Sequence, residues 1–139
     1  MEEHRGARSP VHCLAILLCK DIIEDKYSNN KTLVNTFNNI FADHLPFLYH
    51  KFCVFCSITE VIQRSQLVLS LKKNDSQKEI MNVQAELTSA DPLAVFDLVF
   101  ILNNIILPEY GTYSVELISE GYYITSRKFL LAPFPTQST

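Results

Sequence analysis

Apolar and polar residues alternate with a period of two along most of the chain. The alternation is clearest in four segments, residues 48–58, 65–73, 79–88 and 94–103. In the last segment, Phe96 and Phe100 share one face and Asp97 lies on the other. Successive side chains of a β-strand point to opposite faces, whereas helical spacing would mix the two sets. The pattern therefore predicts strands that each bury one face.

The residues between these segments are typical of tight connections. Asn29 and Asn30 tolerate the left-handed conformation of a turn, and Gly121 supplies the positive φ of a short hairpin. Residues 21–27 fit either one helical turn or a bulged loop. Apolar stretches joined by short polar connections predict an all-β fold, an antiparallel two-sheet sandwich of about eight strands, immunoglobulin-like or C2-like in outline. A closed small barrel is the alternative.

The length of the chain favours a single domain. With 139 residues, of which 47% are hydrophobic, it can bury a core without a disulfide or a metal. The alternating pattern is absent from the first ten residues and fades near the end. We therefore expect a disordered tail at 1–10, a β-sandwich domain at 11–132 and a C-terminal tail at 133–139.

Charge and hydropathy argue against two classes of partner. The net charge of −3 offers no basic face, so we expect no nucleic-acid binding. The apolar stretch at 93–107 is interrupted by Asp97 and is shorter than the roughly 20 residues of a transmembrane helix, so we expect no membrane span. The first apolar stretch ends at Lys20 without a signal-peptide cleavage site, which favours a cytoplasmic location.

Candidate metal ligands are few. Cys53 and Cys56 have the spacing of a redox or zinc pair, but residues three apart on a strand face opposite sides, so their sulfurs diverge. We expect buried, reduced thiols and no metal or cofactor. The densest group of carboxylates is Asp21, Glu24 and Asp25. No loop shows the Asp-x-Asp order of a calcium site, so calcium binding is kept only as an alternative.

Motifs of enzymes are also lacking. Three glycines provide neither a nucleophile elbow nor a phosphate-binding loop. His50 lies on the apolar face of its predicted strand, which indicates a neutral core histidine. His44 and Asp43 are the remaining candidates for base catalysis, although adjacency in sequence does not aim side chains at each other. We expect a protein that is not an enzyme and has no catalytic residue; a small enzyme with a site on this loop is an alternative.

Aromatic side chains near two turns are the strongest signal of function. Tyrosine is favoured at interfaces because it buries a large area and keeps a polar tip. The candidate partner-binding residues surround the loop at Pro46 and the last hairpin: Phe41, His44, Phe47, Tyr49, Tyr110 and Tyr122.

Several short motifs occur in an order that resembles a known family. They are Cys19-Lys20-Asp21, Lys31-Thr32-Leu33-Val34, Asn38-Asn39-Ile40, Leu45-Pro46-Phe47, Leu107-Pro108-Glu109-Tyr110-Gly111-Thr112-Tyr113 and Ser126-Arg127-Lys128-Phe129. From Leu14 to Leu131 the chain resembles an uncharacterised bacterial family of small single-domain β-sandwich proteins, a domain of unknown function. The Pro-Glu-x-Gly-x-Tyr turn is the most distinctive motif. Where a glycine is expected before Phe37, the chain carries Asn35-Thr36.

This resemblance implies a β-sandwich and brings no activity. We therefore expect a non-catalytic protein-interaction or scaffolding module of a bacterial cytoplasm, with a protein partner of unknown identity. It would bind through loops or through an open sheet edge, and such an edge would also support a homodimer. A calcium- or ligand-binding sandwich module is the other alternative to the small enzyme.

Overall fold

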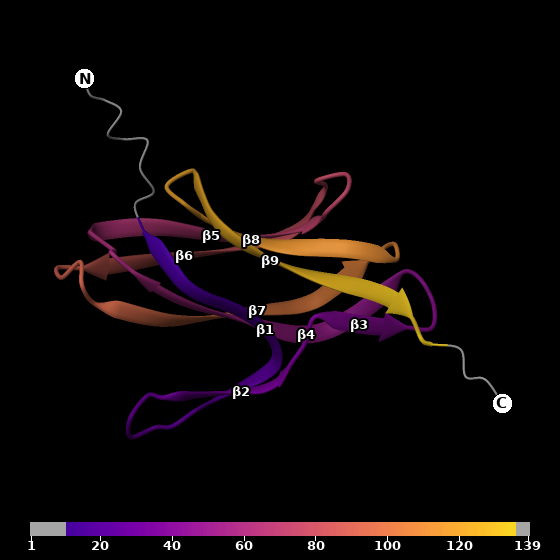
Figure 1. Cartoon of the computed structure of the whole chain (residues 1–139), viewed down its shortest axis with the longest axis horizontal. Helices are drawn as coiled ribbons and strands as arrows, with labels where there is room; N and C mark the ends of the chain where they lie inside the picture. Colours follow the sequence, from indigo (N-terminus) through magenta and orange to yellow (C-terminus); the bar gives the residue numbers. More distant parts are fainter. Residues whose placement is uncertain (1–10, 136–139) are drawn as a thin grey trace.

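Nine β-strands make up the fold. The computed structural model describes residues 11–135 and contains no helix in this range (Figure 1). In chain order the strands are β1 (His12–Glu24), β2 (Lys31–Thr36), β3 (Asn39–Ala42), β4 (Phe47–Thr59), β5 (Gln63–Lys73), β6 (Glu79–Ser89), β7 (Val95–Leu107), β8 (Gly111–Ser119) and β9 (Tyr122–Pro133). The predicted all-β fold is confirmed, with nine strands where about eight were expected. The predicted tail at 1–10 and the last four residues of the other tail lie outside the described residues.

The strands form two sheets. Sheet A has the order β2-β1-β4-β7, and sheet B has the order β3-β9-β8-β5-β6 and curls into half a barrel. All pairs are antiparallel except one, because β3 runs parallel to β9. The expectation of a wholly antiparallel fold is therefore wrong at β3. The chain crosses from sheet A to sheet B between β2 and β3, and β3 there joins the edge of β9, the last strand of the chain.

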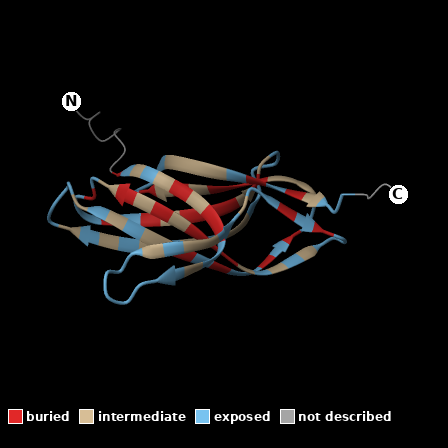
Figure 2. Cartoon of the chain, turned by 60° about the horizontal axis from the view of Figure 1, so that its bottom comes forward, coloured by how far each residue is buried: buried red, intermediate tan, exposed pale blue. Residues whose placement is uncertain are grey.

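The core lies between the two sheets. Short buried and exposed segments alternate along the strands, as Figure 2 shows. In β5, the predicted face of Leu67, Leu69 and Leu71 is at most 1% exposed. The predicted face of β6, an edge strand of sheet B, also packs against this core. This face consists of Met81, Val83, Ala85 and Leu87. Period-two alternation thus identified the buried faces of both strands.

Sheet A changes its inward face at one level of β7. Phe100 and Leu102 are buried, but the buried set then continues at Ile105 and Leu107 instead of at even-numbered positions. Asn104 lies at the change and has a φ of 52°. A left-handed residue rotates the chain and so exchanges the faces of the strand that follows, and asparagine adopts this conformation more readily than most residues.

The paired strand β4 changes its face at the same level. Tyr49 pairs with Ile105 and Lys51 with Asn103, so the register is continuous across the change. Phe52 is buried, but on the other side of the change Tyr49 packs on the core while Leu48 and His50 are exposed. The prediction that His50 is a core histidine is therefore wrong.

The connection between β1 and β2 is a protruding hairpin (Figure 1). Residues 21–24 continue β1, so the helical turn or bulged loop predicted for residues 21–27 is wrong for this part. The turn itself is closed by the Asp25 N–H, which donates to the Asn30 carbonyl (2.8 Å), and by the Asn29 N–H, which donates to the Asp25 carbonyl (2.7 Å). Asn29 has a φ of 62°, as expected for an asparagine in a turn.

The remaining turn predictions are confirmed. Glu120 and Gly121 have φ values of 50° and 82° and join β8 to β9, which is the twist that a two-residue hairpin requires. Asn35 replaces the glycine expected before Phe37, and it keeps a left-handed φ of 54°. Asparagine thus supplies the conformation that glycine would supply at this position.

Tyr113 fixes the connection between β7 and β8. Its hydroxyl donates to the Glu109 carbonyl (2.7 Å) and accepts the Glu109 N–H (3.2 Å). Its ring stacks on Phe129 with the centroids 5.5 Å apart. Gly111 has a φ of 131°, and a Cβ there would lie 2.9 Å from the buried Lys73 Nζ. The Pro-Glu-x-Gly-x-Tyr motif is therefore a structural turn that closes one end of the core.

We expect Tyr113→Phe to lower the free energy of unfolding by about 1–2 kcal/mol, because the substitution leaves two backbone groups of Glu109 without their partner. Urea denaturation followed by circular dichroism measures the change. Tyr123→Phe is the control, since the Tyr123 hydroxyl bonds Ser126 at an exposed site (3.0 Å) and its loss should change stability by less than about 0.5 kcal/mol. Equal stability losses in the two variants would contradict this role of Tyr113.

Candidate functional site

A continuous series of aromatic rings runs from the core to the surface. Phe129 lies 5.8 Å from Phe52, and Phe52 lies 5.7 Å from Tyr49, as measured between ring centroids. Tyr49 in turn lies 5.8 Å from Phe47 at the start of β4. Aromatic rings at these separations and tilts attract each other beyond the area that they bury. The series thus connects sheet B to the surface through sheet A.

The series ends at a groove of about 370 Å³. We call it the aromatic groove, and it is lined by Lys20, Asn35, Thr36, Phe37, Asn39, Ile40, Phe41, Phe47, Tyr49 and Phe134. These residues come from the adjoining parts of β1 to β4 and from the segment after β9. The volume lies within the range of small ligand sites, which are concave and mostly apolar with a few polar groups.

Two exposed rings form one rim of the aromatic groove. Phe41 on β3 is 41% exposed and Phe134 is 60% exposed. Their centroids are 6.0 Å apart with the planes inclined by 30°. Phe134 lies between Pro133 and Pro135, which cannot donate the backbone hydrogen bonds that would extend β9. The chain therefore places an aromatic residue with flanking prolines against the groove.

The electrostatics of the aromatic groove suit an apolar ligand with polar ends. Lys20 is the one charged residue among those that line it. Burial raises the pKa of the Tyr49 hydroxyl, so the phenol is neutral at physiological pH. The side-chain amides of Asn35 and Asn39 can both donate and accept hydrogen bonds. The groove thus combines aromatic walls with a few polar groups.

The structure brings together three of the six candidate partner-binding residues. Phe41, Phe47 and Tyr49 all line the aromatic groove. The Tyr110 hydroxyl donates to the Ala42 carbonyl (3.0 Å), so this residue anchors the end of β3. Tyr122 begins β9, at the end of this strand that is remote from the groove. Tyr110 therefore binds the backbone of a strand that lines the groove without lining the groove itself. Tyr122 belongs to a different surface.

His44, the sixth candidate, lies outside the aromatic groove. Its Nδ1 is 2.6 Å from the Asp43 carboxylate, and this hydrogen bond lowers the pKa of Asp43. The two side chains do aim at each other, contrary to expectation. They are 71% and 78% exposed, however, and an ion pair in water contributes little to stability or to orientation.

Sequence reasoning missed two of the five aromatic residues that line the aromatic groove. Phe37 follows β2, and its ring lies 5.5 Å from that of Phe52. Phe134 falls within the predicted C-terminal tail. The signal that could have found Phe134 is its position between two prolines, since a phenylalanine exposed in a polar tail has no reason to be there unless it packs on something.

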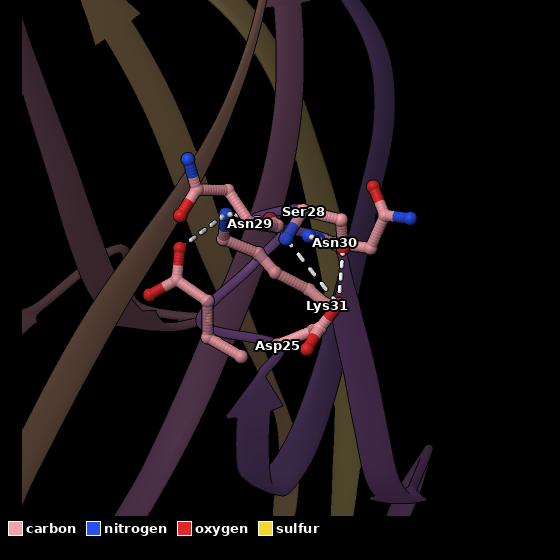
Figure 3. Close-up of polar contacts among 6 residues, drawn as sticks. Asp25, Ser28, Asn29, Asn30 and Lys31 are labelled. Carbon is pink, nitrogen blue, oxygen red and sulfur yellow. Dashed lines mark hydrogen bonds and ion pairs between the residues drawn. The ribbon is translucent and has the colours of Figure 1, made fainter.

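The three carboxylates weighed for calcium have separate partners. Asp21 lies 3.2 Å from Lys51, and Glu24 lies 3.4 Å from Lys31. The Asp25 carboxylate accepts the Ser28 hydroxyl (2.6 Å), as Figure 3 shows. Among residues 11–135, no three potential metal ligands are grouped. Asp25 thus helps to close the β1–β2 turn, Glu24 pairs across the hairpin, and Asp21 pairs with the neighbouring strand β4.

The two cysteines of the Cys-x-x-Cys spacing lie on opposite faces of β4, as predicted. Cys56 belongs to the core between the sheets. Cys53 is on the other face of β4, where it lies opposite Cys19 of β1 in the strand register. All four cysteines are free thiols. Burial raises the pKa of the Cys56 thiol to about 12. A thiol with this pKa is protonated at neutral pH and is therefore a poor nucleophile and a poor metal ligand.

The geometry defines a small all-β protein of two sheets with an aromatic surface groove. The chain belongs to the family described as "Family of unknown function (DUF6941)", which matches residues 14–132. The resemblance to a family of unknown function, inferred from the motifs, is thereby confirmed. No curated protein matches the chain.

The part of the chain that the structure describes has no helix of sufficient length and apolar character to cross a membrane.

We expect iodoacetamide to leave Cys56 unmodified in the native protein at pH 8, because the thiolate is the reacting form and the Cys56 pKa is about 12. Cys13 is half-buried and should react first among the four thiols. Peptide mass spectrometry measures the modification of each cysteine, and the protein unfolded in urea serves as the fully reactive control. Modification of native Cys56 as fast as Cys13 would contradict this expectation.

Proposed function

We propose that the protein is a non-catalytic protein-interaction module, and that its aromatic groove binds a short extended segment of a partner protein. The observation that carries the proposal is the meeting of five aromatic side chains from separate segments at one partly open groove: Phe37, Phe41, Phe47, Tyr49 and Phe134. Exposed aromatic residues are costly in water, and they are enriched at interfaces because rigid rings bury a large area with little loss of entropy.

The neighbouring segment of the chain indicates the chemistry of the bound peptide. Phe134 stacks on Phe41 from an extended segment with prolines on both sides. A partner segment with an aromatic or branched aliphatic side chain, held extended by proline, would present the same features. Extended proline-containing segments bind aromatic-lined grooves with a small entropic cost because their backbone is already ordered. Asn35 and Asn39 would bond the peptide backbone.

The alternatives have less support. The aromatic groove is lined by neither a histidine nor a carboxylate, so general acid–base catalysis there would lack its usual groups. Neither residue of the His44–Asp43 pair lines the aromatic groove, and both side chains are largely exposed to water. A calcium site at the β1–β2 hairpin would require the carboxylates to leave Lys51, Lys31 and Ser28.

We further propose an immunoglobulin-like sandwich and a location in a bacterial cytoplasm. The tyrosine whose hydroxyl bonds the backbone four residues upstream, at the entry to a strand, is a feature shared with immunoglobulin-like domains. Cytoplasmic proteins keep their cysteines reduced, and the four free thiols support this location.

Selection of a phage-displayed library of random linear peptides on the immobilised full chain tests the proposed groove. We expect the enriched peptides to share an aromatic or branched aliphatic position. Phe41→Ser should weaken their binding roughly tenfold or more, because it removes an exposed aromatic ring that the peptide would contact, and an aromatic hot-spot side chain contributes about 2 kcal/mol. Fluorescence anisotropy with the labelled enriched peptide measures the dissociation constant.

Tyr27→Ser is the matched control. Tyr27 is also an exposed aromatic residue, 87% accessible, but it lies at the tip of the β1–β2 hairpin. This variant should bind the enriched peptide as tightly as the original protein does. A selection that enriches no peptide, or a peptide that binds Phe41→Ser with unchanged affinity, contradicts the proposal.

A further inference from the structure

We propose that β7 is a second interaction surface, and that a second copy of this chain pairs with it in antiparallel orientation. β7 is an edge strand of sheet A, and among residues 11–135 it pairs with β4 alone. It is 13 residues long, so the side away from β4 presents a row of backbone N–H and C=O groups, and near the end of this row Asn103 to Ile106 adjoin β6 across a pocket that both strands line. Such a row is a template for another strand.

The other three edge strands carry the features that normally prevent pairing. β2 has 6 residues and begins with a lysine, and β3 has 4 residues. β6 carries Glu79 and Glu86, and Glu86 forms an ion pair with Arg64 on the neighbouring strand (2.9 Å). Short length and charged side chains both protect sheet edges. β7 contains no lysine, arginine or proline, and Asp97 is its one charged residue.

The outward face of β7 is apolar along its centre. Val99 and Ile101 are neighbours on this face and Ile101 is 50% exposed, while Val95, which is 56% exposed, lies on the other side of Asp97. The apolar surface continues across sheet A, because Val99 pairs with Phe55, which pairs with Leu17. A strand that paired with β7 would continue this apolar surface beyond the edge of sheet A, and it would cover the exposed backbone of β7.

One register of self-pairing matches polar with polar and apolar with apolar residues. With Phe100 opposite Phe100 of the second copy, Val99 lies opposite Ile101, and Asp97 lies opposite Asn103. The Asp97 carboxylate can then accept a hydrogen bond from the Asn103 amide, twice in each dimer by symmetry. With Asp97 opposite Asp97, two like charges would be adjacent, which is destabilising. Two-fold symmetric pairing always places Asp97 opposite an odd-numbered residue of β7, and apart from Asp97 itself and Asn103 these residues are all apolar.

This register gives a test at a single exposed position. We expect Asn103→Lys to tighten the dimer and Asn103→Asp to weaken it, each by about tenfold in the dissociation constant, because either residue would face Asp97 of the second copy at two symmetric contacts. Sedimentation equilibrium of the full chain over a range of concentrations measures the constant. The original chain should approach twice its mass of 15.9 kDa as its concentration rises.

The effect within one chain has the opposite sign and is therefore separable. Asn103 pairs with Lys51 on β4, so Asn103→Asp should stabilise the monomer slightly and Asn103→Lys should destabilise it. Thermal denaturation at a concentration where the protein is monomeric measures this effect. If the two substitutions acted only through monomer stability, Asn103→Asp would tighten the dimer and Asn103→Lys would weaken it. This is the opposite of the effect expected from contact with Asp97 of the second copy.

Val99→Lys and Gln84→Lys complete the test. Both place a lysine on a sheet edge, but Val99 lies on β7 and Gln84 on β6. Val99→Lys should dissociate the dimer, and Gln84→Lys should leave it intact. The proposal is overturned by a chain that stays monomeric at all concentrations, by a dimer that Gln84→Lys dissociates, or by charge variants of Asn103 that shift the equilibrium in the same direction.

Discussion

The packing of aromatic rings between the two sheets is the interaction on which the other features of the molecule depend. Tyr113 and Phe129 belong to sheet B, Phe52 belongs to sheet A, and the Phe129 ring contacts both of the other rings. The Tyr113 hydroxyl also holds the turn that leads into β8. The same residue therefore contributes to sheet packing and to the path of the chain. From Phe52 the contacts continue through Tyr49 to the surface.

The aromatic groove exists because β4 and β7 exchange their faces at the same level. Without the left-handed Asn104, strict alternation would place Tyr49 on the face opposite Phe52, and the aromatic series would end inside the core. As a result of this exchange, the side chains of Leu48 and His50 are exposed to solvent. The change of faces thus occurs on both paired strands, and on β4 it places Phe47 and Tyr49 in the wall of the groove.

The two proposed interaction surfaces lie at different edges of the molecule. The aromatic groove adjoins β2 and β3, whereas β7 is the opposite edge of sheet A. A second copy on β7 would therefore leave both grooves free, and the dimer would present two of them. Two linked sites bind a partner with repeated segments more tightly than one site does, because the second binding event is intramolecular. This arrangement is consistent with a scaffolding role for the protein.

Sequence alone determined what depends on neighbouring residues. The period of two identified the strands and the buried faces of β5 and β6, glycine and asparagine marked the turns, and the spacing of Cys53 and Cys56 sufficed to separate their sulfurs. These features follow from local geometry. Three of the six candidate binding residues proved to share one groove, because they flank the same loop at Pro46.

Tertiary structure alone decided what depends on residues far apart in the chain. The parallel pairing of β3 with β9 and the stacking of Phe134 on Phe41 join segments that are far apart in the chain, and the exchange of faces at the level of Asn104 involves two separate strands. Periodicity describes one strand and contains no information about its neighbours. A single left-handed residue exchanges the buried and exposed positions of the strand that follows, without any change in the amino-acid composition of that strand. For this reason the faces of β4 and the walls of the aromatic groove became visible only when the strands were assembled.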